Sequence, residues 1–190
     1  YRLQPAEVEY IVNDCEAKLL VTSALLTDTF RGFANKLENA PVCYMLDGVC
    51  NGATSLEQAF EELPETPIID QSYGQSMLYS SGTTGRPKGV KKPPIEIPWG
   101  EGSAVLKAAT SRYNYDGNTV YLSPAPLYHA APLGFNMMVL RAGGTCIIME
   151  HYDSEAALSL IQQYKATHSQ WVPTMFVRML KLPEEVRHRY

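Results

Sequence analysis

The sequence predicts an α/β fold in which helices flank mostly parallel sheets. Segments with apolar residues at helical spacing alternate with short apolar runs that are typical of buried strands, and this alternation characterises a parallel sheet wrapped by helices. Hydrophobic residues make up 45% of the 190 residues and charged residues 19%, as in a globular domain with a core. No apolar run approaches the roughly 20 residues of a membrane-spanning helix, so we expect no transmembrane segment.

Helices and strands alternate from the beginning of the chain. Pro5 suits the first turn of a helix. Ser23 is a candidate cap for the next helix, and Ser55 with Gln58 forms a capping box for a third. The elements expected in this half are a helix within 5–19, a strand over 19–22, a helix over 26–37, a strand over 42–45, a helix over 55–63 and a strand over 76–80.

The second half repeats the alternation after a surface excursion over 92–98, where prolines exclude a helix or a central strand. Asp153 is a candidate cap for a helix that ends at Tyr164. The expected elements are a helix over 103–111, a strand over 119–122, an all-round apolar helix over 133–140, a strand over 145–149, a helix over 157–164, a strand over 169–172 and a helix over 174–181. The composition indicates a single lobe, which is large enough to contain two sheets.

Charge and cysteine content exclude several functions. The chain has 16 basic and 20 acidic residues and no long basic run, so we expect no binding to nucleic acid or to an anionic membrane surface. Its 4 cysteines are scattered without a CxxC pair, which favours reduced thiols, no metal site and a cytoplasmic protein. Because the chain opens on Tyr1 rather than Met and ends at Tyr190, we expect a piece of a longer protein.

The most informative stretch runs from Tyr79 to Val90 and reads YSSGTTGRPKGV. A strand ends there in small residues that lack a Cβ or carry a hydroxyl, so successive backbone N–H groups can converge on an anion. Lys88 adds a mobile positive charge, and Pro87 restricts the backbone before it. The spacing matches neither the Walker A loop nor the dinucleotide fingerprint. We therefore expect a phosphate-binding loop of another kind, with a mobile linker as the alternative.

The segment 80–89, SSGTTGRPKG, resembles the signature loop of the AMP-forming adenylate superfamily, which comprises acyl-CoA synthetases, adenylation domains of peptide synthetases and beetle luciferases. Further segments resemble family motifs in the same order, namely 3–11, 126–129, 142–145 and 171–174. The resemblance covers nearly the whole chain and is greatest to bacterial fatty-acyl-CoA ligases, over 85–92 and 175–180. One departure follows Val90, where Lys91-Lys92-Pro93-Pro94 replaces the Thr-His and helix of many members.

This resemblance implies a fold and a reaction. Residues 1–190 would form part of the large N-terminal lobe of the acyl-CoA synthetase fold, without the C-terminal part of that lobe and without the small C-terminal domain. The parent protein would be a fatty-acid–CoA ligase. It would convert a carboxylic acid and ATP to acyl-AMP and pyrophosphate, and then transfer the acyl group to coenzyme A.

The resemblance also implies site residues. Lys88 and His129 would be catalytic, with Lys88 acting on the charge that grows on pyrophosphate. His129 would orient the acid rather than deprotonate it, because a carboxylic acid is already ionised near neutral pH. His129, Ala130 and Thr174 would border the acyl substrate. The ATP phosphates would be held by Ser80, Ser81, Gly82, Thr83, Thr84, Gly85 and Lys88. A surface ion pair is the alternative for Lys88, and a structural role is the alternative for His129.

Several family elements do not occur in this sequence. They are the Tyr-Gly-x-Thr-Glu segment whose glutamate is the usual Mg²⁺ ligand, the aspartate that holds the ribose, and the catalytic lysine of the small domain. We therefore expect the isolated chain to be inactive, and ATP, Mg²⁺ and coenzyme A to serve the parent protein. Two alternatives stay open: a non-catalytic nucleotide-binding module, and an amino-acid or aryl-acid adenylation domain.

Overall fold

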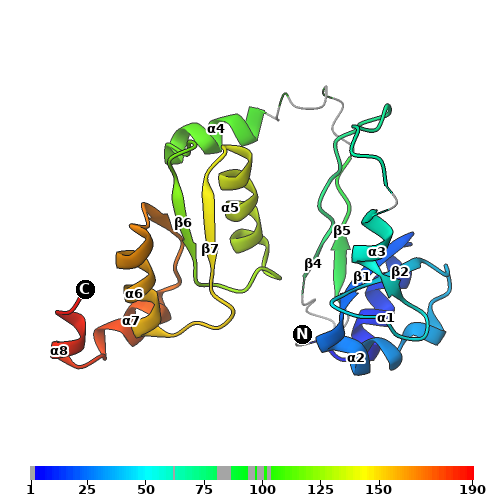
Figure 1. The fold of residues 1–190 in the computed structure, drawn as a ribbon, viewed down its shortest axis with the longest axis horizontal. Coiled ribbons are helices and arrows are strands. Elements are labelled where there is room, and N and C mark those ends of the chain that lie inside the picture. Colours follow the sequence, from blue (N-terminus) through cyan, green and yellow to red (C-terminus); the bar gives the residue numbers. More distant parts are fainter. Residues whose placement is uncertain (1–2, 62, 81–86, 94–96, 98–100, 102–103) are drawn as a thin grey trace. The chain divides into compact units, whose positions relative to one another are not determined.

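The computed structural model describes residues 3–61, 63–80, 87–93, 97, 101 and 104–190. The chain forms two compact units, Tyr1–Glu96 and Ile97–Tyr190, and each is described by itself (Figure 1). Each unit contains its own parallel sheet. Within the described ranges, no helix combines the length and the apolar character that crossing a membrane requires.

The first unit is built on a parallel sheet of strand order β1-β2-β3. Its elements are α1 (Pro5–Asp14), β1 (Leu19–Ser23), η1 (Ala24–Leu26), α2 (Thr27–Arg31), η2 (Ala34–Lys36), β2 (Val42–Leu46), β3 (Thr54–Ser55) and α3 (Leu56–Glu61). The strands expected over 19–22 and 42–45 are confirmed as β1 and β2, which pair along their whole length. The buried core comprises Phe30, Phe33, Met45 and Ala53.

The single helix expected over 26–37 is wrong, because this segment consists of η1, α2 and η2. Gly32 follows α2 where the chain passes close to the first helix, and a Cβ at Gly32 would lie 2.9 Å from the side chain of Pro5. Phe33 then leaves helical geometry at φ −132°. Its ring packs edge-on against Phe30 with 5.5 Å between the ring centroids. Core packing thus overrides the helical spacing of this segment.

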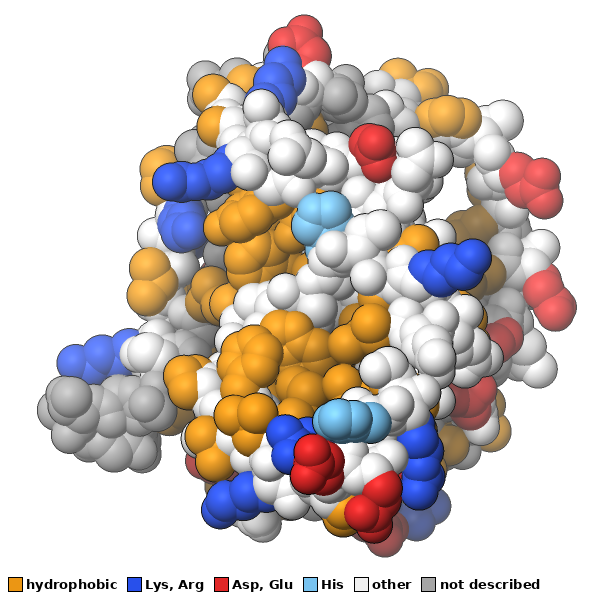
Figure 2. Space-filling view, turned by 90° about the vertical axis from the view of Figure 1, so that its left-hand side faces the viewer, with side chains coloured by type: hydrophobic (Ala, Val, Ile, Leu, Met, Phe, Trp, Pro, Cys, Tyr) orange, Lys and Arg blue, Asp and Glu red, His pale blue; other side chains and the backbone are white. Residues whose placement is uncertain are grey.

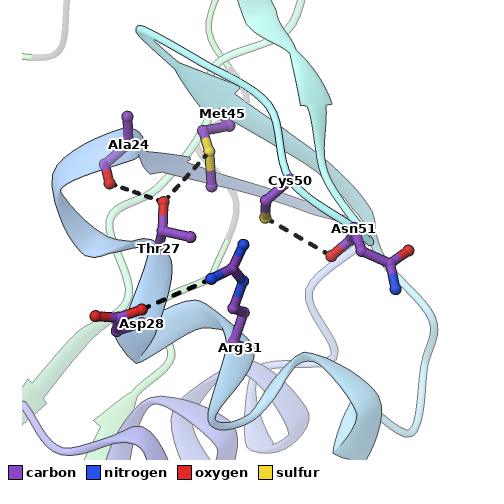
Figure 3. Close-up of polar contacts among 7 residues, drawn as sticks. All are labelled: Ala24, Thr27, Asp28, Arg31, Met45, Cys50 and Asn51. Carbon is purple, nitrogen blue, oxygen red and sulfur yellow. Dashed lines mark hydrogen bonds and ion pairs between the residues drawn. The ribbon is translucent and has the colours of Figure 1, made fainter.

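Of the two helix caps expected in the first unit, the one at Ser23 differs from expectation. Ser23 forms no side-chain cap. Instead, Thr27 Oγ1 donates a hydrogen bond of 2.7 Å to the carbonyl of Ala24 and lies 3.9 Å from Met45 Sδ in β2 (Figure 3). These contacts tie the segment after β1 to the neighbouring strand. At Ser55 one of the two hydrogen bonds of the expected capping box is present, since its Oγ accepts a 3.2 Å hydrogen bond from the backbone N–H of Gln58 at the start of α3.

A two-stranded antiparallel hairpin, β4 (Leu78–Ser80) with β5 (Lys88–Val90), completes the first unit. The expected strand over 76–80 is confirmed in its second part as β4. The partner strand β5 was not expected, because three residues between a proline and two lysines carry no periodic signal.

The second unit is a parallel sheet of strand order β7-β6-β8 with helices on both faces (Figure 1). Its elements are α4 (Ala104–Tyr113), β6 (Val120–Ser123), α5 (Ala130–Arg141), β7 (Thr145–Ile148), α6 (Ser154–Tyr164), β8 (His168–Ser169), α7 (Pro173–Leu180) and α8 (Glu184–Arg187). Tyr121 packs with Val139 of α5, whereas the next residue, Leu122, packs with Ala157 of α6. Alternate residues of the central strand therefore face different helices.

Most elements of the second unit agree with expectation. Asp153 caps α6, since its Oδ1 accepts a 2.8 Å hydrogen bond from the N–H of Ala156. The expected helix over 133–140 begins earlier, at Ala130. The expected strand over 169–172 is wrong in its extent, because β8 covers only His168–Ser169 and the chain reaches α7 without further pairing. The short helix α8 was not expected.

Apolar side chains gather on the surface of the second unit. Met175 of α7 is buried, and its carbonyl accepts a 2.9 Å hydrogen bond from the hydroxyl of Tyr152. The exposed apolar residues on and next to this helix are Val172, Phe176, Val177 and Leu180. Figure 2, which views the side of the molecule where α6, α7 and α8 are drawn in Figure 1, shows apolar patches beside two histidines. The exposed surface of α7 therefore carries several apolar side chains beside the polar residues Thr174 and Arg178.

Candidate functional site

The β4–β5 hairpin fixes both ends of the signature loop. Ser80 is the last residue of β4 and lies opposite Lys88, the first residue of β5. The Ser80 hydroxyl donates a 3.5 Å hydrogen bond to the carbonyl of Lys88. The predicted phosphate-binding residues between them, Ser81, Gly82, Thr83, Thr84 and Gly85, lie outside the described residues. The hairpin therefore brings two predicted binding residues, Ser80 and Lys88, to adjacent positions.

The side chains of Ser80 and Lys88 are exposed. Among the ion pairs formed within the described part of the chain, none involves Lys88. That part of the chain thus gives no support to a surface ion pair as the role of Lys88. An exposed ammonium group on a flexible side chain, next to a closely paired strand end, can reach an anionic ligand bound at the loop.

Gly89 is required by the packing of the hairpin. It lies opposite Tyr79, whose ring covers it. A Cβ at Gly89 would lie 2.8 Å from Cζ of Tyr79, which real Cβ atoms do not tolerate. This glycine of the signature segment therefore has a structural role in the hairpin, because it lets the tyrosine ring lie across the neighbouring strand.

The hairpin is linked to α1 by a hydrogen bond between side chains. The hydroxyl of Tyr79 donates to Oδ2 of Asp14 at 2.5 Å, and the hydroxyl of Tyr10 lies 3.5 Å from the other carboxylate oxygen. Burial raises the pKa of Tyr79, and the hydrogen bond to the negatively charged Asp14 raises it further. The hydroxyl of Tyr79 therefore stays protonated at neutral pH and can donate this hydrogen bond. Sequence reasoning missed Asp14, because no pattern links residues 65 positions apart.

A hollow lies between α1 and Pro87, the residue before Lys88. Four carboxylate residues line it, namely Glu7, Glu9, Asp14 and Glu38. The ammonium group of Lys36 lies 3.7 Å from Glu9, so one of these charges is partly offset. The remaining negative charge disfavours phosphate here. An ATP phosphate held by the hairpin would therefore lie away from this hollow.

In the second unit, His129 stands between the central strand and α5. The chain leaves β6 after Ser123 and reaches His129, which is the residue before the first turn of the helix. Its backbone N–H donates a 3.2 Å hydrogen bond to the carbonyl of Pro126. Its ring lies against Tyr128, with 4.4 Å between centroids, and the side chain is exposed. His129 is thus held through its backbone, while its ring reaches the surface at the carboxyl end of a parallel strand, where ligands of α/β sheets bind.

Asn136, in the middle of α5, joins this helix to the end of β6. Its side chain is 3% exposed, and Nδ2 donates 2.8 Å hydrogen bonds to Oγ of Ser123 and to the carbonyl of Pro132. Its Oδ1 is buried and has no partner among the described residues. Sequence reasoning missed this residue, although an amide in an otherwise apolar helix was a visible signal.

The predicted acyl-site residues fall in the second unit. Ala130 is the exposed first residue of α5, and Thr174 is exposed in the first turn of α7. Their helices follow the neighbouring parallel strands β6 and β8, so both residues come after the carboxyl end of a strand. The predicted ATP residues Ser80 and Lys88 belong to the first unit.

The described residues contain no group of three or more His, Cys, Asp or Glu side chains that could hold a metal ion. The Mg²⁺ ligand that the resemblance implies is a glutamate in a segment that does not occur in this sequence.

Comparison with known proteins finds a family model and several CoA ligases to which the chain is similar. A family model described as AMP-binding enzyme matches residues 1–190. The 4-coumarate–CoA ligase 1 of Petroselinum crispum is 31% identical over 183 residues, which are 94% of this chain and 33% of that protein. The 4-hydroxybutyrate–CoA ligase 2 of Metallosphaera sedula is 26% identical over 196 residues, an alignment that covers 94% of this chain and 34% of that protein. The chain spans about a third of the length of these relatives.

Solved structures show the same fold. ATP-bound MatB from Rhodopseudomonas palustris matches 98% of this chain and 36% of its own, at a TM-score of 0.72 and 25% identity. The N-terminal domain of FACL13 from Mycobacterium tuberculosis matches 96% of this chain and 44% of its own, at a TM-score of 0.72 and 24% identity. Helix-flanked parallel sheets of the N-terminal lobe of adenylate-forming enzymes are thus confirmed as the fold class. The chain belongs to the AMP-binding enzyme family.

Proposed function

We propose that this chain is part of the large N-terminal lobe of an ATP-dependent acyl-CoA synthetase. The parent protein joins a carboxylic acid to the AMP part of ATP, which gives acyl-AMP and releases pyrophosphate. It then transfers the acyl group from acyl-AMP to the thiol of coenzyme A. The observation that carries the proposal is the hairpin, which pairs Ser80 with Lys88 across the ends of the signature loop. Membership of the AMP-binding enzyme family supports it.

The hairpin acts on the phosphates of ATP. When the carboxylate oxygen attacks the α-phosphorus, the bond to pyrophosphate breaks and negative charge grows on the leaving group. The hydroxyl of Ser80 and the ammonium of Lys88 stabilise that charge as hydrogen-bond donors, together with Ser81, Gly82, Thr83, Thr84 and Gly85. Lys88 forms no covalent bond and transfers no proton. Positioned donors of this kind accelerate phosphoryl chemistry mainly by electrostatics.

His129 orients the acid. Its backbone is held before α5 while its ring is exposed, so the ring can donate a hydrogen bond to a substrate carboxylate without leaving its place. Ala130 and Thr174 border the acyl group beside it. Because the carboxylate is already ionised at neutral pH, His129 removes no proton.

The acid is a fatty acid in this proposal. The support is the resemblance of the segments 85–92 and 175–180 to bacterial fatty-acyl-CoA ligases. An aryl acid is the second candidate, because a 4-coumarate–CoA ligase is 31% identical to this chain. ATP, Mg²⁺ and coenzyme A serve the parent protein, whose proposed location is the cytoplasm, and neither nucleic acid nor an anionic membrane surface is a partner.

Formation of acyl-CoA from a panel of acids tests the proposal. Purified parent protein is incubated with ATP, Mg²⁺, coenzyme A and one acid at a time. The panel comprises short, medium and long fatty acids, cinnamic-type acids and amino acids. The thioester and AMP are quantified in each reaction. We expect equal amounts of thioester and AMP with fatty acids and little of either with amino acids. A preference for cinnamic-type acids would select the aryl-acid candidate. AMP without thioester on every acid would contradict a CoA ligase.

A further inference from the structure

The hairpin that carries the signature loop is small. Each of its strands has three residues, and a two-stranded ribbon of this length is at best marginally stable alone. The outer positions Leu78, Ser80, Lys88 and Val90 are exposed, whereas the central pair, Tyr79 with Gly89, is partly buried. The hairpin therefore needs contacts on the face of Tyr79 to keep one position relative to the rest of its unit.

The Tyr79 hydroxyl supplies such a contact through Asp14, the last residue of α1. The preceding residue of α1, Asn13, also forms side-chain hydrogen bonds, and its Oδ1 accepts one of 3.0 Å from the N–H of Glu38. Its Nδ2 donates a 3.3 Å hydrogen bond to the carbonyl of Lys36. Neighbouring side chains of α1 thus join the hairpin to the segment that leads into β2.

We propose that Asp14 is a positioning residue for the nucleotide-binding hairpin: by accepting the hydrogen bond of Tyr79, it holds Ser80 and Lys88 in the arrangement that binds ATP. This inference rests on the proposed function, because it assigns the hairpin to ATP. Asp14 touches no reacting atom. The raised pKa of Tyr79 agrees with a donor that stays protonated.

The proposal predicts a particular kinetic effect. Without the carboxylate, the hairpin occupies its binding arrangement for a smaller fraction of the time, and apparent affinity falls by that fraction. In the parent protein, Asp14→Ala should raise KM for ATP by about fivefold or more. The kcat at saturating ATP and the KM for the acid should stay near wild type, because bound ATP restores the arrangement. A loss of folded protein alone would instead lower kcat and leave KM for ATP unchanged.

Three further variants separate the hydrogen bond from other effects. Asp14→Asn keeps an oxygen acceptor and should recover most of the wild-type KM for ATP. Tyr79→Phe removes the donor but keeps the ring over Gly89, and should match Asp14→Ala. The double variant Asp14→Ala/Tyr79→Phe should have a KM for ATP no higher than that of either single variant, as expected when both residues belong to one interaction. Asp28→Ala is the matched control, since Asp28 is an exposed aspartate whose partner is Arg31 on its own helix.

Two results would overturn the proposal: a wild-type KM for ATP in Asp14→Ala, or additive effects of Asp14→Ala and Tyr79→Phe. Failure of the proposed function is recognised separately, as absence of acid-dependent AMP formation in the wild-type protein. In that event amide hydrogen exchange decides whether Asp14 anchors the hairpin. Faster exchange of residues 78–80 and 88–90 in Asp14→Ala than in Asp28→Ala would support the anchor, and equal exchange would refute it.

Discussion

At the level of single residues, charge and position support the different roles proposed for Lys88 and His129. Lys88 brings an exposed ammonium group to the end of the signature loop, directly opposite Ser80. His129 presents an exposed ring, while its backbone is held by Pro126 and by the first turn of α5. Neither side chain contributes to a buried core, so substitution of either should change kinetics more than folding.

For Lys88→Ala in the parent protein, we expect adenylation to slow by more than ~10-fold with a smaller change in KM for ATP. The reason is that the ammonium group acts mainly on charge that develops in the transition state. Single-turnover formation of acyl-AMP measures the effect. Lys91→Ala, an exposed lysine just beyond β5, is the matched control and should behave as wild type. Unchanged adenylation in Lys88→Ala would remove this residue from the mechanism.

For His129→Ala, the KM and kcat for the acid should change while the melting temperature stays close to wild type. The side chain is exposed and does not cap α5, so its removal leaves no buried group unpaired. Steady-state kinetics with varied acid and a thermal melt on the same preparation make the comparison. His188→Ala, another exposed histidine, controls for nonspecific effects. Normal kinetics with a large loss of melting temperature would return His129 to a purely structural role.

At the level of elements, one side-chain contact in each unit joins two elements next to a candidate site. Asp14 joins the hairpin to α1, and Asn136 joins α5 to the end of β6. The two contacts differ in burial, since Asn136 is almost wholly enclosed whereas Asp14 is exposed. Loss of Asn136 should therefore cost stability, and loss of Asp14 should alter mainly the placement of the hairpin.

Asn136→Ala should lower the free energy of unfolding by about 1–3 kcal/mol, because it removes two hydrogen bonds and leaves the buried hydroxyl of Ser123 without this partner. Urea denaturation of the 190-residue chain measures the change. Asn35→Ala, at an exposed position in η2, is the matched control and should change stability little. Equal midpoints for the two variants would contradict the role assigned to Asn136.

The elements that the sequence predicts well are those whose pattern is local. The strands β1, β2, β6 and β7 are short apolar runs between helical segments, and each was expected within about a residue of its place. Asp153 was expected as a cap because its signal lies within one turn. The broken helix after β1 escaped prediction, since Phe33 leaves helical geometry and packs against Phe30 in a core that no local pattern describes.

The same distinction applies to the candidate sites. The signature loop is contiguous, so its residues can be proposed from sequence alone, and residues 81–85 lie outside the described residues. Tyr79 and Asp14 meet across 65 positions, and Ser123 and Asn136 lie on different elements. Such contacts depend on how elements pack, and composition or periodicity cannot specify them.

At the level of the whole molecule, the proposed functions are divided between the units. The hairpin proposed to bind ATP belongs to Tyr1–Glu96, whereas His129, Ala130 and Thr174 belong to Ile97–Tyr190. The chain spans about a third of the length of its curated relatives. We therefore expect that the 190-residue chain alone carries out no complete reaction and that the parent protein does.

The most direct test of the central claim is ATP–pyrophosphate exchange, measured with and without a fatty acid on the parent protein, on its Lys88→Ala variant and on the 190-residue chain. We predict exchange by the parent protein that requires the acid, falls by more than ~10-fold in the variant and is absent from the isolated chain. Binding of ATP without any acid-dependent exchange by the parent protein would contradict the claim, and would indicate a nucleotide-binding module that performs no adenylation.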